Sequence, residues 1–366
     1  MKLPFDRYFV SQRTKPVVGV DIGASCIKFA EIELTDDKPK LLNFGSIPTP
    51  DGAFGGSSIS KPDAISEAIV KLFKSHQVET TRVAFSLPSS SVFTKRISMS
   101  KTAANNFEDN IEFEASNYIP HRIDAVNLDY QVLSPDDSDA KSSTVDVLLV
   151  AVKQEFLSPY LKLFSDIDLE PVIADVESFA ICNAFEHSSM SSTIKTPTAI
   201  IDIGNRHTTI TLMKNGKFLL SGEVNVGSRN YITALIDNLK VSNDQANLLV
   251  SGVKIPEVDD VLVQETIDRV TDYVGGEVHR QTGFFWSGAG VTQDFEQVLF
   301  SGGGARIPGL VADLKSRFDK KCDFLNIGEF MDVSTEIDKK HFDELSLSLN
   351  VALGLALRRS SDKFVN

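Results

Sequence analysis

The chain has 366 residues, of which 42% are hydrophobic and 24% charged, and its formal net charge at pH 7 is −13. This length predicts two or three domains, and the composition is that of a globular protein with sizeable cores. The acidic balance argues against a general nucleic-acid-binding protein, which would normally be basic. Because Cys26, Cys182 and Cys322 form no CxxC pair and no metal-ligand spacing, we expect buried, reduced thiols.

The first fifteen residues, MKLPFDRYFVSQRTK, contain no apolar segment of signal-peptide length. No run of 18 apolar residues occurs anywhere in the chain, so we expect no membrane-spanning helix. A short apolar cluster at residues 3–10 lies beside basic residues. We expect an arm packed on the fold or a disordered segment here, with contact to a membrane surface as the alternative.

The first half of the chain alternates predicted strands and helices. Apolar runs bounded by Gly or Pro predict strands, and apolar residues at helical spacing predict helices. Segments rich in Pro, Gly, Ser and Asp predict loops at 48–62 and 134–143. Strands are expected within 17–34 (two strands and a turn) and at 82–87, 126–133, 145–152 and 171–176, and helices at 62–75, 101–118 and 153–167.

The second half repeats the opening theme. Residues 198–224 predict a strand, a turn, a second strand and a third strand, with Asn215-Gly216 as a hairpin turn between the last two. Both halves therefore begin with an apolar strand that ends in Asp-Ile-Gly, at Asp21 and at Asp202. This internal echo predicts two similar α/β halves whose turns face one another.

The first turn, DIGASCIK, carries chemistry suited to an anion. Gly23 allows backbone N–H groups to approach a phosphate closely, and Ser25 adds a hydroxyl donor. Asp21 cannot bind phosphate directly, so its expected role is to hold Mg²⁺, usually through metal-bound water. Lys28 either lies near the phosphates or faces outward.

The second turn follows the same logic through Asp202, Gly204, Asn205, Thr208 and Thr209. Two aspartates facing each other across Mg²⁺ and a triphosphate would offset the charge of the ligand. One such turn is weak evidence, because Asp-x-Gly occurs in many ordinary hairpins. Two in matching contexts predict a phosphate site.

A third motif, LFSGGGARIPGL, follows an apolar strand and precedes a helix that we expect to start near Pro308. Gly302, Gly303 and Gly304 would let the backbone lie flat against a base, ribose or phosphate. The spacing is neither GxGxxG nor GxxxxGK[ST], which excludes Rossmann and P-loop sites. A plain strand-to-helix turn is the alternative.

These three motifs together resemble the actin/Hsp70/sugar-kinase superfamily. Further segments resemble the PilM family of actin-like type IV pilus assembly proteins and the related FtsA proteins, and the resemblance runs from about residue 15 to 360. The matching strings are GVDIGASCIKFAEI, FEASNYIPHRIDAVNLDYQVL, PVIADVESFAICNAF, IIDIGNRHTTITLMKNGKF and VLFSGGGARIPGL. The NYIPHRIDAVNLDYQVL segment is the most specific, since sugar kinases and Hsp70 proteins lack a counterpart.

The resemblance implies an α/β actin-like fold, with two duplicated halves around a nucleotide cleft and an FtsA-like inserted subdomain. It also implies ATP and Mg²⁺ as cofactors. The implied divisions are a first lobe at 15–82 (completed by about 156–195 and 340–360), an inserted subdomain at 83–155, a second-lobe core at 196–240 and 287–339, and a further subdomain at 241–286.

Site residues carried over from the resemblance concern hydrolysis and the nucleoside. Glu177 takes the place of a glutamate that orients the attacking water, and Ser178 stands where relatives carry proline. A carboxylate at a helix start is the alternative for Glu177. Asn247 and Val250 take the places where relatives carry a glutamate for the ribose and a lysine for the base. The resemblance therefore implies weaker nucleotide binding and slow or absent hydrolysis.

The implied function is a cytoplasmic scaffold on the inner face of the inner membrane. Its expected partners are the N-terminal tail of a PilN-like membrane protein and the pilus motor ATPases, with self-association possible and nucleic acid excluded. Tyr118, Ile119 and Pro120 are candidates for supporting the groove for the tail, unless they are only core residues of the inserted subdomain. Alternatives are an FtsA-like division filament, against which the short polar C-terminus argues, and a metabolic kinase, for which no dedicated Asp base is evident.

Overall fold

The computed structural model describes residues 16–34, 38–56, 58–100, 113–133, 144–188, 190, 196–290 and 293–358. The apolar cluster at 3–10 and the loop at 134–143 lie outside these residues, as does most of the helix expected at 101–118. Residues 113–116, at the end of that segment, are helical.

A six-stranded sheet forms the framework of the first lobe, in the order β10-β6-β1-β2-β3-β16. β1 pairs with β2 as an antiparallel hairpin and with β6 in parallel. All five residues of β1 are buried, as expected for a central strand. The strands are β1 (Val18–Ile22), β2 (Cys26–Leu34), β3 (Pro39–Pro48), β6 (Arg82–Leu87), β10 (Glu170–Val176) and β16 (Asp332–Val333).

The sheet of the second lobe has five strands in the order β13-β12-β11-β14-β15 and repeats the same pairing pattern. β11 forms an antiparallel hairpin with β12 and pairs in parallel with β14. Asn215 and Gly216 both have positive φ, at 52° and 74°, so the expected Asn-Gly hairpin turn is confirmed. The strands are β11 (Thr198–Ile203), β12 (Thr208–Lys214), β13 (Lys217–Val224), β14 (Gln297–Ser301) and β15 (Lys321–Phe324).

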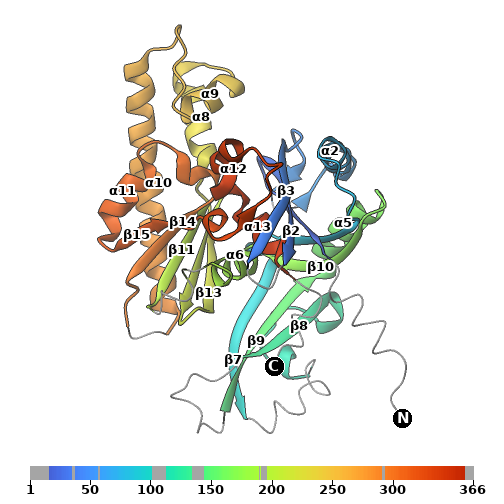
Figure 1. Cartoon of the computed structure of the whole chain (residues 1–366). Helices are drawn as coiled ribbons and strands as arrows, with labels where there is room; N and C mark the ends of the chain where they lie inside the picture. Colours follow the sequence, from blue (N-terminus) through green and yellow to red (C-terminus); the bar gives the residue numbers. More distant parts are fainter. Residues whose placement is uncertain are drawn as a thin grey trace.

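Two helices lie between the sheets, α6 (Glu177–Glu186) and α13 (Asn350–Ala356), as Figure 1 shows. Their apolar residues join Ile200, Met213 and Leu299 of the second sheet in one core. The two helices cross closely, because a Cβ on Gly354 would come within 2.0 Å of the Ala180 carbonyl oxygen. The lobes are therefore held together by a shared core as well as by surface contacts.

The remaining helices cover the outer parts of the two lobes. On the first lobe these are α2 (Pro62–Ser75) and α5 (Gln154–Ser165). The second lobe carries α8 (Ser228–Leu239), α9 (Asn243–Val250), α10 (Asp260–Gly288) and α11 (Leu310–Phe318). Smaller elements are β4 (Phe54–Gly55), β5 (Ser58–Ile59), η4 (Gly303–Arg306), η5 (Ile327–Phe330), α12 (Lys339–Leu345) and η6 (Ser346–Leu349).

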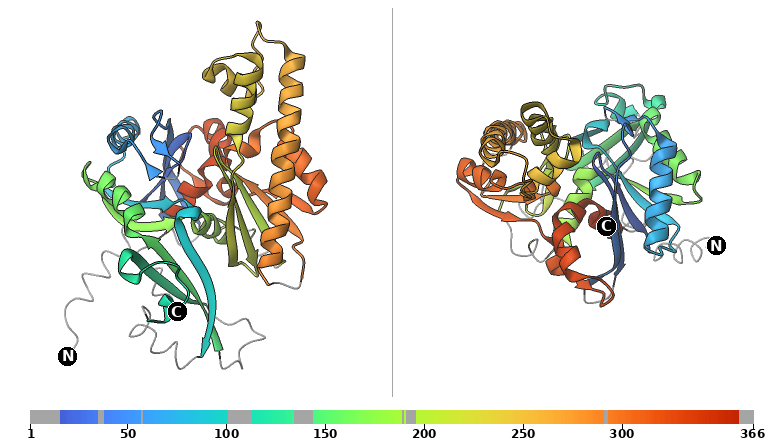
Figure 2. Two further views of the ribbon diagram at one scale, coloured as in Figure 1. Left: turned by 180° about the vertical axis from the view of Figure 1, so that it is seen from behind. Right: turned by 90° about the horizontal axis from the view of Figure 1, so that it is seen from above.

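A separate three-stranded sheet, β7-β9-β8, extends from the first lobe (Figure 2). It is inserted between β6 and α5 and has its own small core, which includes Ile97, Ile119 and Val147. Its elements are η1 (Ser89–Ser91), β7 (Val92–Ser100), η2 (Ile123–Ala125), β8 (Val126–Leu133) and β9 (Thr144–Lys153).

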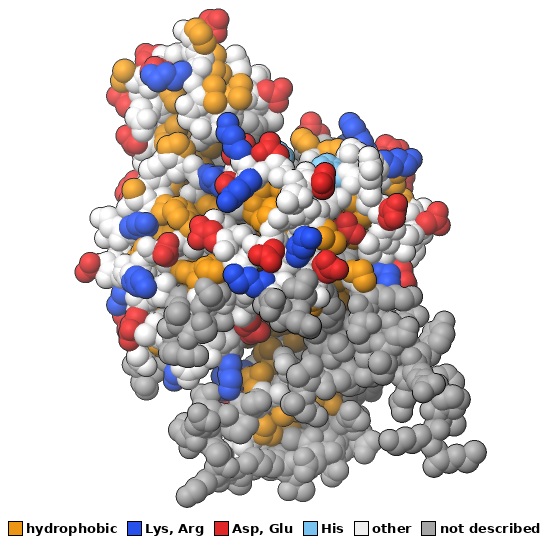
Figure 3. All heavy atoms as spheres, in the orientation of Figure 1, with side chains coloured by type: hydrophobic (Ala, Val, Ile, Leu, Met, Phe, Trp, Pro, Cys, Tyr) orange, Lys and Arg blue, Asp and Glu red, His pale blue; other side chains and the backbone are white. Residues whose placement is uncertain are grey.

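Acidic and basic side chains are intermixed on the face of the two lobes that Figure 3 shows. Within the ranges that the structure describes, no helix combines the length and the apolar composition needed to cross a membrane.

Candidate functional site

The two Asp-Ile-Gly turns have the same backbone hydrogen bond. The Gly23 N–H donates to the Cys26 carbonyl over 3.1 Å, and the Gly204 N–H donates to the His207 carbonyl over 3.1 Å. A Cβ would come within 2.9 Å of the acceptor oxygen at Gly23 and within 2.7 Å at Gly204. Each turn therefore needs glycine for its close backbone approach, and the sequence echo extends to hydrogen-bond geometry.

In the first turn, Lys28 faces Asp21 rather than solvent. The two residues are opposite each other in the β1–β2 register, and the Lys28 Nζ lies 2.6 Å from the Asp21 carboxylate. Burial acts to lower the pKa of Lys28, but the Asp21 carboxylate outweighs it and the pKa is raised. Ser25 is exposed at the tip, so its hydroxyl is accessible to a ligand.

Sequence reasoning missed Thr49, which supports this turn from the end of β3. Its hydroxyl donates to the Gly23 carbonyl over 2.7 Å, and its N–H donates to the Ser25 carbonyl over 2.9 Å. These two hydrogen bonds stabilise the conformation of the turn. A threonine just after an apolar strand carries no motif, so no local signal could have identified it.

The residues of the second turn differ in their degree of burial. Thr208 and Thr209 are buried, and the Thr208 hydroxyl donates to the Val226 carbonyl over 2.8 Å. The Asn205 amide donates to the Ser228 hydroxyl over 3.1 Å. These side chains fix the hairpin, so a ligand at this turn would meet its backbone and Asp202.

Asp202 is the next-to-last residue of β11 and lies beside Ser301, its neighbour in the parallel pairing with β14. Burial raises the pKa of Asp202, with a smaller contribution in the same direction from Asp21. A hydrogen bond with Ser301 and the charge of Lys28 act in the opposite direction. The two aspartates thus influence each other electrostatically, and Lys28 acts on both.

The three glycines after β14 have different roles. Gly302 has φ 85°, and a Cβ there would lie 2.4 Å from the Ile203 carbonyl oxygen; a Cβ on Gly304 would lie 2.4 Å from the Ile203 side chain. Gly303 is exposed, and a Cβ there would meet nothing closer than 3.7 Å. Close packing against β11 therefore explains the need for glycine at Gly302 and Gly304. The backbone of Gly303, by contrast, is accessible.

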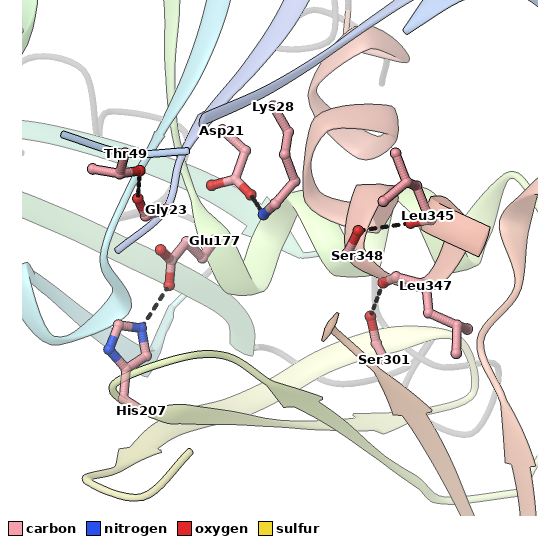
Figure 4. Close-up of polar contacts among 10 residues, drawn as sticks. All are labelled: Asp21, Gly23, Lys28, Thr49, Glu177, His207, Ser301, Leu345, Leu347 and Ser348. Atoms are coloured by element: carbon pink, nitrogen blue, oxygen red, sulfur yellow. Dashed lines mark hydrogen bonds and ion pairs between the residues drawn. The ribbon is translucent and has the colours of Figure 1, made fainter. Parts of the chain in front are cut away.

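Glu177 begins α6 and reaches across to the second lobe (Figure 4). Its carboxylate lies 3.5 Å from the Nε2 of His207, a residue of the second turn. Burial raises the pKa of Glu177. Burial acts to lower the pKa of His207, but the Glu177 carboxylate raises it to about 9. His207 lies within the second motif, but sequence reasoning missed it because only the Asp, Gly, Asn and Thr residues of that motif were assigned to the phosphate site.

Two further contacts join the lobes beside this ion pair. The Arg206 guanidinium donates to the Gly56 carbonyl over 3.0 Å. The Glu223 carboxylate of β13 accepts from the Ser90 N–H over 2.7 Å, at the point where the chain enters the three-stranded sheet. Residues around the second turn therefore contact the first lobe and the base of the inserted sheet.

The two residues expected on the nucleoside side, Asn247 and Val250, lie on α9. Asn247 is exposed, and its amide donates to the Asn243 carbonyl of the same helix over 2.8 Å. Val250 is 8% exposed and packs into the core of the second lobe. Val250 thus faces inward and offers only packing at the place where the resemblance implies a base-contacting lysine in relatives.

Two surface hollows lie outside the Asp-Ile-Gly turns. One of about 520 Å³ lies between α2 and the end of α5. Another of about 700 Å³ is lined by η5, α12 and the residues Ala305 and Arg306 that follow the glycine turn.

The paired hairpins, their parallel neighbours and the two helices between the sheets define an actin-like fold. Two solved structures share it. The PilM–PilN type IV pilus biogenesis complex matches with a TM-score of 0.81 and 24% identity, covering 94% of this chain and 98% of that chain. The ethanolamine utilization protein EutJ from Carboxydothermus hydrogenoformans matches with a TM-score of 0.52 and 13% identity, covering 95% and 93%.

Residues 19–360 match the family described as type IV pilus assembly protein PilM. Because this match covers nearly the whole chain, the protein belongs to the PilM family. The sequence resemblance and the actin-like α/β fold are thereby confirmed.

Proposed function

We propose that this PilM-family protein binds Mg²⁺–ATP between its two Asp-Ile-Gly turns and acts as a nucleotide-stabilised scaffold. The observation that carries the proposal is the pair of turns with the same Gly N–H bond, one from each lobe, each beside an aspartate. Nucleotide held between two lobes favours the form in which both contact it. ATP is in this view a clamp, and its hydrolysis is slow.

The residues present fit such a ligand. Asp21 and Asp202 offer carboxylates to Mg²⁺ or its water, and Lys28 adds a positive charge beside them. Gly303 presents exposed backbone, and Ser25 an exposed hydroxyl. Bound Mg²⁺–ATP would supply a phosphoryl group, and both lobes would contact the charged ligand. Glu177 would orient water, as far as its contact with His207 permits.

We propose that the scaffold grips the N-terminal tail of a PilN-like membrane protein. Support comes from the fold shared with the solved PilM–PilN complex. The three-stranded sheet, within the proposed subdomain 83–155, would form one wall of the groove. Tyr118 is 38% exposed with the Lys95 ammonium 5.3 Å from its ring centre, whereas Ile119 is 5% exposed in the core. Tyr118 is thus the better candidate for contact.

The proposed divisions are a first lobe at 15–82 completed by about 156–195 and 340–360, an inserted subdomain at 83–155, and a second lobe at 196–339 whose residues 241–286 form a separate subdomain. The sheets differ from these bounds at β6 (Arg82–Leu87) and β16 (Asp332–Val333), because both strands belong to the sheet of the first lobe. The protein would lie on the cytoplasmic face of the inner membrane and link the PilN-like protein to pilus motor ATPases. Self-association of the scaffold belongs to the same proposal.

A thermal-shift titration tests nucleotide binding. Mg²⁺–ATP at a hundredfold excess over Kd should stabilise the protein by roughly 2.7 kcal/mol. Asp202→Ala should remove that response, and Asp237→Ala on the exposed face of α8 should keep it. An unchanged melting curve of the wild type at millimolar Mg²⁺–ATP would reject the proposal.

A further inference from the structure

Three side chains outside the Asp21–Asp202 pair converge at the boundary of the lobes. Glu177, His207 and Glu223 each place a ligand atom within 4.8 Å of the other two. They come from three elements: Glu177 from the start of α6, His207 from the turn after β11, and Glu223 from β13. One histidine nitrogen and two carboxylate oxygens form a ligand set suited to borderline divalent metal ions.

The charges of this cluster favour a cation. Two carboxylates face one imidazole, so the cluster is negative even when His207 carries a proton. Two basic side chains of the neighbouring turns have other partners, because Lys28 pairs with Asp21 and Arg206 donates to the Gly56 carbonyl. All three cluster residues are partly buried, where uncompensated charge is unfavourable.

The distances also suit a metal ion. Bonds of about 2.0–2.2 Å to nitrogen and oxygen place neighbouring ligand atoms roughly 3.3–3.5 Å apart in a tetrahedral site. His207 Nε2 and a Glu177 oxygen are already 3.5 Å apart. A shift of roughly 1 Å would bring ligand atoms at most 4.8 Å apart to that spacing. A fourth position would remain for water.

We propose that Glu177, His207 and Glu223 form a binding site for a divalent transition metal such as Zn²⁺ that joins the two lobes. Glu177 belongs to the first lobe, and His207 and Glu223 to the second, so one ion bonds to both. Glu223 also accepts from Ser90 N–H, which carries the connection to the base of the three-stranded sheet. The site uses none of the residues assigned to the proposed Mg²⁺ position, which are Asp21 and Asp202.

The proposed metal site and the proposed nucleotide site share one residue, Glu177. A metal bound to Glu177 withdraws that carboxylate from the orientation of water. The ion would therefore clamp the lobes and suppress hydrolysis together. Metal binding itself does not depend on ATP binding, so the two ideas can fail separately.

The test is calorimetric titration of the full chain with ZnCl₂ at pH 8, after EDTA treatment and without Mg²⁺ or nucleotide. We expect one equivalent to bind and to raise the melting temperature. His207→Gln and Glu223→Gln should each weaken binding on the order of tenfold or more. His187→Gln, a matched histidine change at the end of α6, should leave it unchanged.

Cobalt(II) serves as a spectroscopic probe, since a site of one nitrogen and two oxygens gives no thiolate charge-transfer band. Such a band would assign the metal to a cysteine and overturn the proposal. The absence of binding at 100-fold excess of zinc over protein would also overturn it, as would equal affinity in wild type and in the His207 and Glu223 variants. Weakening in only one of these two variants would reject the three-ligand assignment. Circular dichroism of each variant verifies that it is folded.

Discussion

The Lys28 ammonium lies 2.6 Å from the carboxylate of Asp21, which is only 5% exposed. Removing the lysine leaves a buried, uncompensated charge. We expect Lys28→Met to lower the free energy of unfolding by about 1–3 kcal/mol, measured by urea denaturation. Lys28→Met combined with Asp21→Asn should recover most of that loss. Lys71→Met, on the exposed face of α2, is the control, and an equal loss there would contradict the pairing argument.

Asp202 is expected to oppose folding at neutral pH in the ligand-free protein. Its folded pKa is raised, mainly by burial. Such a carboxyl favours folding fully only below its unfolded pKa, and the contribution is lost as pH rises through the folded pKa. Asp202→Asn should therefore stabilise the ligand-free protein at pH 7, by about 1 kcal/mol, and the gain should vanish near pH 3.5.

The same substitution should abolish the stabilisation by Mg²⁺–ATP. Thermal melts at both pH values, with and without nucleotide, measure the two effects. Asp237→Asn should change neither the stability of the ligand-free protein nor its stabilisation by Mg²⁺–ATP by more than about 0.5 kcal/mol. A variant at position 202 that is less stable than wild type at pH 7 would show that the carboxylate is stabilised in the ligand-free protein.

Phosphate release should be slow. Glu177 is held by His207, and Asn247, which the sequence resemblance assigns to the ribose side of the nucleotide, is exposed. We expect steady-state release below about 1 s⁻¹, under the usual range of enzymes, because small misplacements reduce rates by orders of magnitude. Glu177→Gln should lower the rate to background, and Glu67→Gln should not. Release faster than about 1 s⁻¹ would refute the clamp.

Gly354 sets the spacing of the helices between the lobes. A Cβ there would lie 2.0 Å from the Ala180 carbonyl oxygen, so the backbone itself would have to move. We expect Gly354→Ala to destabilise the protein by about 1–3 kcal/mol in chemical denaturation. Gly283→Ala, in the exposed part of α10 where nothing lies within 4 Å, should instead stabilise it by up to about 1 kcal/mol. Similar effects at both sites would contradict close packing as the cause.

Tyr118 should contribute to the partner groove. Its ring is partly exposed beside Lys95. We expect Tyr118→Ala to weaken binding of a PilN-type N-terminal peptide about tenfold, measured by fluorescence anisotropy. Phe284→Ala removes a ring that is 70% exposed on α10 and should leave the affinity unchanged. If deletion of the three-stranded sheet, residues 92–153, leaves a folded chain with full affinity, the groove assignment is wrong.

Local signals were sufficient for the hairpins and their turns. The requirement for glycine at Gly23 and Gly204 and the Asn215-Gly216 turn depend on neighbouring residues, so they could be read from short strings. The repetition of this hairpin in two similar α/β halves followed from the internal echo, whereas the parallel strand beside each hairpin is seen only in the structure.

Side-chain partners across the lobes could not be read in this way. The Glu177–His207 pair exists because α6 packs between two sheets, which no local pattern specifies. Thr208 and Thr209 were expected at the site, yet both are buried and Thr208 bonds to Val226. The packing of the hairpin decides this burial, and a short motif does not specify that packing.

The first lobe is built from segments at both ends of the described chain. β16 pairs with β3, and α13 packs on β1 and β2, although both follow the second lobe in sequence. The strands of the second sheet, by contrast, lie within one continuous stretch from Thr198 to Phe324. During synthesis the chain emerges from its N-terminus, so the second lobe can fold on the ribosome before the first is complete. The face of β1 and β2 on which α13 packs stays uncovered until α13 has been translated, so the nascent first lobe exposes apolar surface while the second lobe is being made.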